Sequence, residues 1–325
     1  MGQREIRNRM RGGCGAQGNT KFYLYNRWRC AASYRRGGYM ETDQRRIAGS
    51  NTKQLTILYE AFGKPSKLKK DWGYSALIEY AGKRILFDTG NNADLLKHNV
   101  EALGINLKGL DFVVLSHRHG DHTSGLSYIL SVDPEVAIYT PYEISGFGTP
   151  VLPGIVAVMN RHLASLPKDM HYFGGHPQLP RPSGSPWPTA HFIQIEKASE
   201  VAPGVFLIPL VSNTAGTKEM QEISLALRTP EGLVVMVGCS HPGIQDIVQE
   251  AARLDDRIYS VFGGFHQLGA SDAEIQKVAS ALHDRWKIKR IGPGHCSGLP
   301  TFAALRDLYK EKYLYAGLGS VIPLP

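Results

Sequence analysis

Cysteine is scarce in this 325-residue chain, and no long apolar run occurs in it. A helix that crosses a membrane needs about 20 consecutive apolar residues, and no stretch comes near that length. The four cysteines also lack the density of a small secreted disulfide scaffold. We therefore expect a cytoplasmic protein with reduced thiols and no membrane association. Two thiols, Cys239 and Cys296, each lie within two residues of a histidine, which suggests thiols near a metal.

Acidic residues are rare at the N-terminal end of the sequence. Residues 1–52 hold eleven Lys and Arg against three acidic residues, whereas residues 53–325 hold 26 of each sign. The net charge of +8 therefore belongs to a separable Gly- and Arg-rich extension, and the main domain is neutral. Nucleic acid is an expected partner only for the extension, because a neutral domain offers the phosphate backbone little attraction.

The composition of residues 1–52 favours a poorly ordered tail without a catalytic role. The segment lacks the apolar stretch of a secretory signal. A transit-like peptide, and translated sequence upstream of a start at Met40, are the alternatives. Four aromatic residues of the extension are also compatible with a contact between subunits in a homo-oligomer: Phe22, Tyr23, Tyr25 and Trp28.

The main domain, 53–325, alternates strand-like and helix-like segments. Apolar and β-branched runs predict strands over 55–59, 72–80, 84–88, 111–116, 136–139, 205–208, 223–227, 233–237, 258–262 and 288–291. Spacing and flanking residues predict helices over 93–103, 125–130, 244–253, 272–286 and 301–313. Residues 141–190 fit neither pattern, because they are rich in proline, glycine and aromatic residues. We interpret them as a lid insertion over a pocket, with an irregular insert as the alternative.

A dense cluster of metal-ligand side chains follows the predicted strand 111–116. It contains His117, His119, Asp121 and His122 within six residues. Zinc and similar divalent metals take nitrogen and carboxylate ligands of this kind. One such turn can serve two metals about 3.5–4 Å apart, which would hold a hydroxide between them. The cluster therefore predicts a two-metal centre that needs two or three further ligands.

Three other predicted strands also end in a histidine, namely His241, His266 and His295. His241 and His295 are the best additional ligands, since flanking Gly or Pro residues fix each in a tight turn. For His266 the residues leave metal binding, substrate contact, proton donation and a hydrogen bond within the turn open, and we favour substrate contact or support of a ligand.

The remaining polar residues near these motifs are assigned smaller roles. We expect Asp88 to hydrogen-bond to the backbone or to a ligating histidine. Cys239 is either a bridging ligand or a small buried side chain. Glu222 and Lys218 are interpreted as ordinary surface charges unless the pocket reaches them. No role in the site is expected for the histidines of the lid and its exit: His162, His171, His176 and His191.

These motifs together resemble the metallo-β-lactamase superfamily. The resemblance covers 53–325 and is carried by His-x-His-x-Asp-His at 117–122 and by the upstream Phe-Asp-Thr-Gly at 87–90. The motifs at 72–75, 86–90, 238–243, 263–266 and 295–298 resemble the branch named after dihydropterin ribofuranosylaminobenzene-phosphate synthase. The resemblance implies an α/β fold, the αββα sandwich of two mixed β-sheets flanked by helices. It also implies a dinuclear metal site at one edge of the sheets.

The chain departs from lactamases and lactonases at two places. No Gly-His-Thr-x-Gly-His occurs between residues 123 and 238, so His241 is carried over as the replacement ligand. Gly238-Cys239 stands where the family has Gly-Asp, the usual bridging carboxylate. His119 stands where iron-binding flavoprotein relatives place a carboxylate, which favours zinc.

We therefore predict a zinc-dependent hydrolase with two metal ions, for which Mn²⁺ or Fe²⁺ are alternatives. His117, His119 and His241 would hold one metal. Asp121, His122 and His295 would hold the other, and Asp121 would orient the attacking hydroxide. The expected substrate is a small ester, lactone, amide (including a β-lactam) or phosphoester. The alternatives are a synthase-type transferase acting on a phosphorylated ribose, and a nucleic-acid-binding protein that uses residues 1–52.

Overall fold

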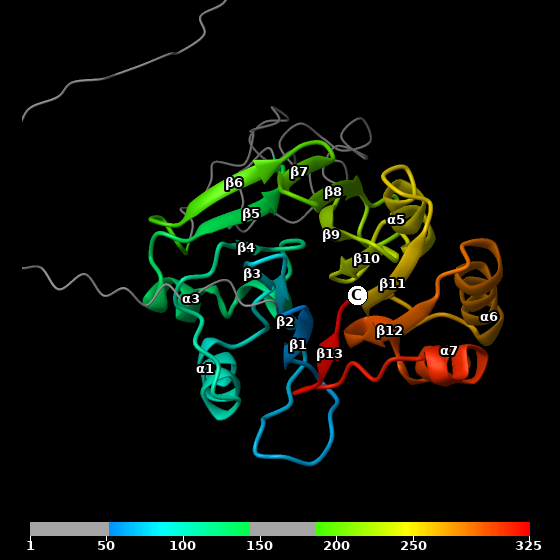
Figure 1. Cartoon of the computed structure of the whole chain (residues 1–325), viewed down its shortest axis with the longest axis horizontal. Helices are drawn as coiled ribbons and strands as arrows, with labels where there is room; N and C mark the ends of the chain where they lie inside the picture. Colours follow the sequence, from blue (N-terminus) through cyan, green and yellow to red (C-terminus); the bar gives the residue numbers. More distant parts are fainter. Residues whose placement is uncertain (1–51, 144–185) are drawn as a thin grey trace, which may run out of the picture. The chain divides into compact units, whose positions relative to one another are not determined.

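The structure is a computed structural model that describes residues 52–143 and 186–325 (Figure 1). The predicted basic extension at 1–52 and most of the predicted lid at 141–190 lie outside these residues, so both stay predictions. Within the described ranges, no helix has the length and apolar character that a membrane span requires.

Seven strands form the first sheet, in which an antiparallel half adjoins a parallel half. In spatial order they are β13 (Val321–Pro323), β1 (Gln54–Tyr59), β2 (Ser75–Tyr80), β3 (Lys83–Phe87), β4 (Phe112–Val114), β5 (Ala137–Pro141) and β6 (His191–Ile195). The strands predicted over 72–80 and 84–88 are confirmed as β2 and β3, which pair as an antiparallel hairpin. Its two loop residues, Ala81 and Gly82, both have a positive φ, which matches the twist of a two-residue hairpin.

Six strands form the second sheet. They follow the order β12 (Arg290–Gly294), β11 (Ile258–Gly264), β10 (Gly232–Val237), β9 (Gln221–Thr229), β8 (Val205–Val211) and β7 (Ser199–Ala202). The strands predicted over 223–227 and 233–237 are confirmed as β9 and β10, which form an antiparallel ladder. By contrast, β10, β11 and β12 run parallel, so their carboxyl ends meet at one edge of the sheet.

The two sheets face each other across one apolar core. Ile78 and Phe87 of the first sheet pack in the same cluster as Leu225 and Val234 of the second, and all four are fully buried. Alternating side chains of each strand also face outward, where a second apolar layer needs helices to cover it.

Helices cover the outer faces of both sheets (Figure 1). The first sheet is covered by α1 (Ala93–Ala102) and α3 (Leu126–Val132), and the second by α5 (Ile244–Ala251), α6 (Asp272–Ser280) and α7 (Leu299–Tyr309). A short helix, α2 (Gly120–Thr123), lies within the histidine motif. Single helical turns occur at η4 (Ala281–Arg285), η5 (His295–Ser297) and η6 (Lys310–Lys312). The predicted αββα sandwich is therefore confirmed.

Four elements were not predicted from the sequence: α2, β6, β7 and β13. β13 is only three residues long and ends in proline, so it carries no periodic pattern and forms only by pairing with β1. β7 is a partly exposed edge strand that is held by β8 alone.

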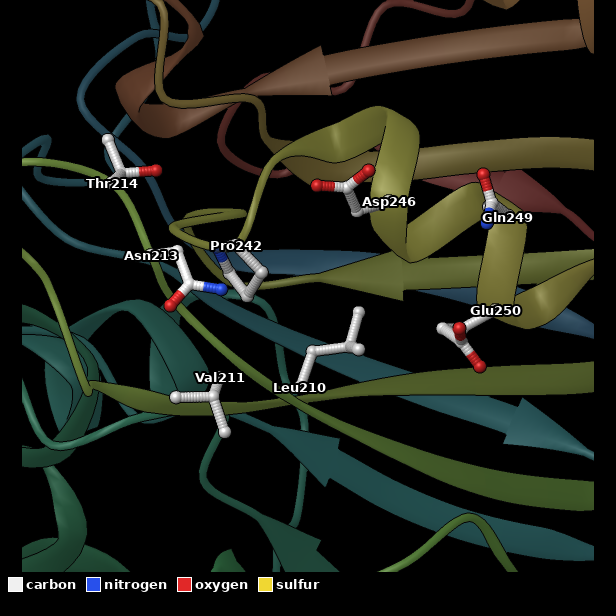
Figure 2. A pocket seen from close by; sticks show the side chains of 8 residues that line it. All are labelled: Leu210, Val211, Asn213, Thr214, Pro242, Asp246, Gln249 and Glu250. Carbon is white, nitrogen blue, oxygen red and sulfur yellow. The ribbon is translucent and has the colours of Figure 1, made fainter.

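A cavity of about 450 Å³ lies between α5 and the end of β8 (Figure 2). Leu210 and Val211 form its apolar wall, and Asp246 and Glu250 bring two carboxylates from α5. None of the predicted site residues lines this cavity.

We expect Leu225→Ala to lower the free energy of unfolding by about 2–5 kcal/mol, because the fully buried side chain fills the space between the sheets. Urea denaturation measures this loss. Leu299→Ala is the matched control, because that leucine is 77% exposed and should change stability by about 0.5 kcal/mol or less. Equal effects of the two substitutions would contradict the proposed location of the core.

Candidate metal centre

Strand ends of both sheets position the candidate ligands. Asp88 directly follows β3, and the histidine motif begins three residues beyond β4. In the second sheet, His241 follows β10, and His295 follows β12 directly. Loops at these edges can present side chains to a shared site while the strands keep the backbone rigid.

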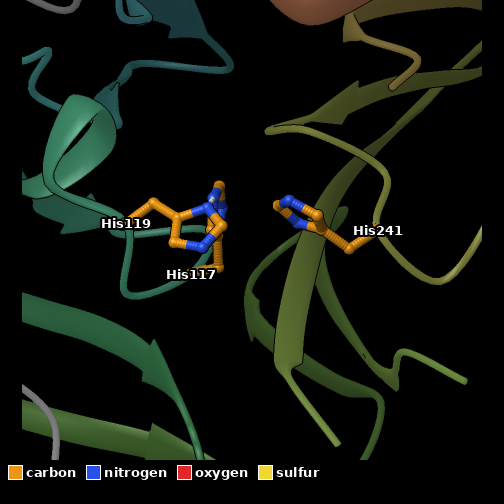
Figure 3. A group of neighbouring side chains, drawn as sticks. All are labelled: His117, His119 and His241. Carbon is orange, nitrogen blue, oxygen red and sulfur yellow. Dashed lines mark hydrogen bonds between the residues drawn. The ribbon is translucent and has the colours of Figure 1, made fainter. Parts of the chain in front are cut away.

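His117, His119 and His241 form one group (Figure 3). One ring nitrogen of each lies within 4.8 Å of those of the other two. The closest pair is His117 Nε2 and His119 Nδ1, at 3.1 Å. The ring of His241 approaches from the second sheet, with its centroid 4.6 Å from that of His117.

Asp121, His122 and His295 form a second group beside the first. His122 Nε2 lies 3.1 Å from His295 Nε2, and Asp121 Oδ2 lies 3.3 Å from the same His295 atom. The rings of His117 and His122 link the two groups, with centroids 4.2 Å apart. The structure thus brings together all six residues that the sequence predicts as ligands, in the two predicted sets; ligation itself stays a prediction.

Hydrogen bonds on the far side of two rings define which nitrogen faces the centre. Ser116 Oγ donates to Asp88 Oδ2 and therefore accepts from His117 Nδ1, at 2.9 Å. His241 Nδ1 donates to Glu222 Oε2, at 2.8 Å. With Nδ1 protonated, Nε2 of each neutral ring carries a lone pair, which is the form that binds a metal. Lone pairs that converge in this way repel each other unless a cation lies between them, so these residues fit a metal.

Asp88 orients His122, as expected from the sequence. Its buried carboxylate accepts from His122 Nδ1 at 2.7 Å and from Ser116 N at 2.7 Å. Burial disfavours charge on His122, but the Asp88 carboxylate outweighs it and raises the pKa of His122 to about 9. A metal ion therefore has to displace a proton from His122 Nε2, so that binding releases a proton at neutral pH.

Asp121 is ionised despite its partial burial. Burial opposes the charge, but the hydrogen bond with His295 and the neighbouring imidazoles outweigh it and hold the pKa of Asp121 well below its usual range. His117 differs in that its uncharged form is favoured, because burial and then the adjacent imidazoles lower the pKa of His117. One anionic oxygen and several neutral imidazoles are the ligand set that zinc prefers.

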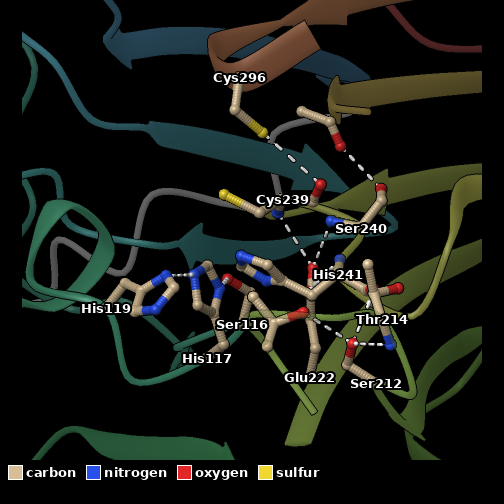
Figure 4. Close-up of polar contacts among 12 residues, drawn as sticks. Ser116, His117, His119, Ser212, Thr214, Glu222, Cys239, Ser240, His241 and Cys296 are labelled. Atoms are coloured by element: carbon tan, nitrogen blue, oxygen red, sulfur yellow. Dashed lines mark hydrogen bonds and ion pairs between the residues drawn. The ribbon is translucent and has the colours of Figure 1, made fainter. Parts of the chain in front are cut away.

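The prediction that Glu222 is a surface charge is wrong. Glu222 is 1% exposed and accepts four hydrogen bonds (Figure 4). They come from the backbone N–H groups of Cys239, Ser240 and His241 and from His241 Nδ1. Glu222 lies at the second residue of β9, where the strand turns its carboxylate toward the loop after β10. Lys218, in contrast, is exposed, as predicted.

Four residues at this edge of the fold have a strained backbone. Asp88, Ser240, His266 and His295 all adopt a positive φ, between 46° and 63°, although none is glycine. This left-handed conformation costs on the order of 1 kcal/mol or more per residue and persists where the surroundings impose it, typically at functional sites.

Cys239 lies next to both groups, and His266 lies next to the first. Cys239 Sγ is 3.2 Å from His122 Nε2, and the ring of His266 is 4.5 Å from that of His241. Of the histidines expected to have no role, His191 is exposed in β6, and His162, His171 and His176 lie outside the described residues.

Three residues of the site were given no role by the sequence assignment. Cys296 lies within reach of Cys239 and His266, and the sequence indicated it only as a thiol near a metal, within the motif at 295–298. The ring of Trp72 lies 4.7 Å from that of His295. Glu60 accepts from His295 N at 2.8 Å, and burial raises the pKa of Glu60 to about 8. Trp72 belongs to the motif at 72–75, which indicates no contact with His295, and no sequence signal indicates Glu60, since both contacts join distant parts of the chain.

Comparisons with known proteins agree with this geometry. Residues 73–207 match the profile described as the Metallo-beta-lactamase superfamily. The chain is 30% identical over 287 residues to the 7,8-dihydropterin-6-methyl-4-(beta-D-ribofuranosyl)-aminobenzene-5'-phosphate synthase of Methanocaldococcus jannaschii, which covers 84% of this chain and 96% of that protein.

Two solved structures have similar folds. Tm1679, described as a metal-dependent hydrolase of the beta-lactamase superfamily, has a TM-score of 0.61 and 25% identity, over 84% of this chain and 99% of its own. YhfI from Bacillus subtilis, a metallo-beta-lactamase fold protein, has a TM-score of 0.51 and 13% identity over the same shares, which shows the likeness of the fold.

We expect Glu222→Gln to weaken zinc binding by about 10–100-fold, because an amide cannot accept all four hydrogen bonds and leaves His241 unoriented. Titration of the metal-free protein with Zn²⁺ measures the change. Glu219→Gln, at an exposed residue three positions earlier, is the control and should bind as the unmodified chain does. Unchanged affinity in Glu222→Gln would show that this carboxylate does not support a ligand.

Proposed function

Because the chain belongs to the metallo-β-lactamase superfamily, as its motifs predict, we propose that it is a metal-dependent hydrolase with a dinuclear zinc centre. The observation that carries the proposal is the convergence of two three-residue groups, six ligand atoms in all, from strand ends of both sheets. Two zinc ions would supply a Lewis acid and a water acidified to near-neutral pKa.

The residues have separate tasks in this proposal. His117, His119 and His241 hold one ion, and Asp121, His122 and His295 hold the other. Asp121 keeps a carboxylate in the centre, where it can accept a hydrogen bond from the attacking water. Its side chain is 19% exposed, whereas those of His122 and His295 are fully buried. A substrate can therefore approach Asp121 while the histidines stay shielded from bulk water.

The ligand set supports zinc rather than a harder metal. Five of the six proposed ligands are imidazoles, and Cys239 Sγ lies 3.2 Å from His122 at the place where the family has a bridging carboxylate. Nitrogen and sulfur ligands suit zinc, whereas carboxylate-rich sets suit Mg²⁺ or Mn²⁺.

The chemistry of such a centre suits a small ester, lactone, amide or phosphoester. Each has a carbonyl or phosphoryl oxygen for one cation to polarise and a carbon or phosphorus for water to attack. Arg118, the cation within the histidine motif, donates from Nε to Glu143 Oε1 at 2.8 Å. This pairing leaves Arg118 less suited to hold a substrate phosphate, which supports uncharged carbonyl substrates.

A transferase is the second candidate, and one specific observation favours it. The similarity to the Methanocaldococcus jannaschii synthase extends over 96% of that protein. In this alternative, the cations hold a phosphorylated ribose that is joined to an aminobenzoate, and water is not the nucleophile.

We expect His119→Ala to reduce turnover to the background rate while the fold is retained, because the substitution removes one ligand of a loop that is otherwise held by Asp88 and Ser116. The assay uses zinc-loaded protein with lactone, phosphodiester and β-lactam substrates, and circular dichroism checks the fold. His191→Ala, at an exposed position of β6, is the control.

The same assay separates the two candidates. Hydrolysis of at least one substrate of the panel, lost in His119→Ala and after metal removal, supports the hydrolase. An inert panel combined with condensation of a phosphorylated ribose donor and an aminobenzoate supports the transferase. Full activity in metal-stripped protein would overturn both.

A further inference from the structure

We infer that Cys239, His266 and Cys296 form a third metal position, rich in thiolate, beside the two groups described above. Their two sulfur atoms and one ring nitrogen all lie within 4.8 Å of one another. His266 and Cys296 belong to neither of the other groups. The inference rests on this cluster and holds for either candidate reaction.

The sheet itself brings the three side chains together. They follow β10, β11 and β12, which are adjacent and parallel. Gly263 of β11 is in register with Val237 of β10 and with Pro293 of β12. Cys239, His266 and Cys296 each come two or three residues after the in-register residue of their own strand. The cluster therefore arises from the strand register rather than from a chance approach of loops.

The backbone around the sulfur atoms leaves room for Cys296 and for little else. A Cβ atom placed on Gly264 would lie 2.6 Å from Cys296 Sγ and 2.6 Å from Gly238 O. Glycine is therefore required at this residue of β11 if the thiol is to occupy its place. His266, two residues later, has a φ of 51°, a left-handed conformation that aims its ring at the cluster.

The three side chains have the chemistry of a zinc site. Two sulfurs and one imidazole are a known ligand set for zinc, in which a fourth position stays open. Cys239 and Cys296 are 4% and 3% exposed, whereas His266 is exposed to solvent. Cys296 Sγ donates to Cys239 O at a long distance, 3.5 Å (Figure 4), and it also contacts the side chains of Cys239 and His266. A metal ion would therefore take the place of contacts that the three side chains already make with one another, and its open position would face the solvent side.

Cys239 links this third position to the dinuclear centre. Its sulfur lies 3.2 Å from His122 Nε2 and belongs to a group with His117 and His122 as well. A thiolate can bridge two cations, so an ion bound by Cys296 and His266 would share a ligand with the centre. Cys239 is consequently unsuitable as a test residue, whereas Cys296 and His266 belong to the third group only.

The test is a titration with Co²⁺ alone of the full chain carrying Cys14→Ser and Cys30→Ser, so that only Cys239 and Cys296 remain as thiols. The protein is metal-free and reduced, and its two thiols are counted beforehand. We expect three bound Co²⁺ per chain and a near-ultraviolet charge-transfer band from thiolate to Co²⁺. Cys296→Ser should lose one equivalent and weaken the band. His266→Gln should also lose one equivalent of Co²⁺. Because this side chain is exposed, we expect the variant to fold as the parent chain does.

Two controls separate this result from the dinuclear centre. His283→Gln, at a half-exposed histidine that pairs with Asp284, should still bind three equivalents. His119→Ala should lose one equivalent of Co²⁺ and keep the thiolate band. Loss of metal from the dinuclear centre is thereby distinguished from loss at the third position. Saturation at two equivalents in the parent chain, or three equivalents retained in both Cys296→Ser and His266→Gln, would overturn the third position.

Discussion

Two buried carboxylates, Asp88 and Glu222, support the whole site. Each is removed from water, which costs several kcal/mol for an ion unless hydrogen bonds compensate it. Each is compensated by backbone and imidazole N–H groups of a neighbouring loop. The same bonds therefore stabilise the buried charge, fix the loop and orient one histidine. Removing either carboxylate would therefore loosen its loop and disorient its histidine at the same time.

The two carboxylates act from different sheets. Asp88 follows β3 and holds the histidine motif through Ser116 and His122. Glu222 is in β9 and holds the loop of His241. The face-to-face packing of the sheets then sets the distance between the two loops, because the shared core fixes how closely the strand ends approach. The left-handed residues at these ends are tolerated because this packing imposes them.

Much of this arrangement could be predicted from the sequence, because it is encoded locally. The histidine motif is contiguous, and His241 and His295 follow apolar strands in turns with Gly or Pro. The main strands were predictable from apolar runs of ordinary length. Short edge strands such as β7 and β13 were not, since they depend on a neighbouring strand rather than on a pattern of their own.

The supporting residues were harder to predict for a physical reason. Glu222 precedes an apolar strand, and a carboxylate there is usually solvated; only the loop after β10 makes its burial favourable. Glu60 meets His295 N across 235 residues, and Trp72 reaches the same histidine from before β2. Contacts of this range follow from the packing of the two sheets, which a single sequence does not specify residue by residue.

The central claim is that two cations lie between the loops of the two sheets. Anomalous X-ray diffraction at the zinc absorption edge, from crystals of the full chain grown with Zn²⁺, tests it most directly. The account predicts one peak among His117, His119 and His241 and another among Asp121, His122 and His295, about 3.5–4 Å apart. Well-ordered side chains with no anomalous peak at either position, or zinc bound only elsewhere on the chain, would contradict it.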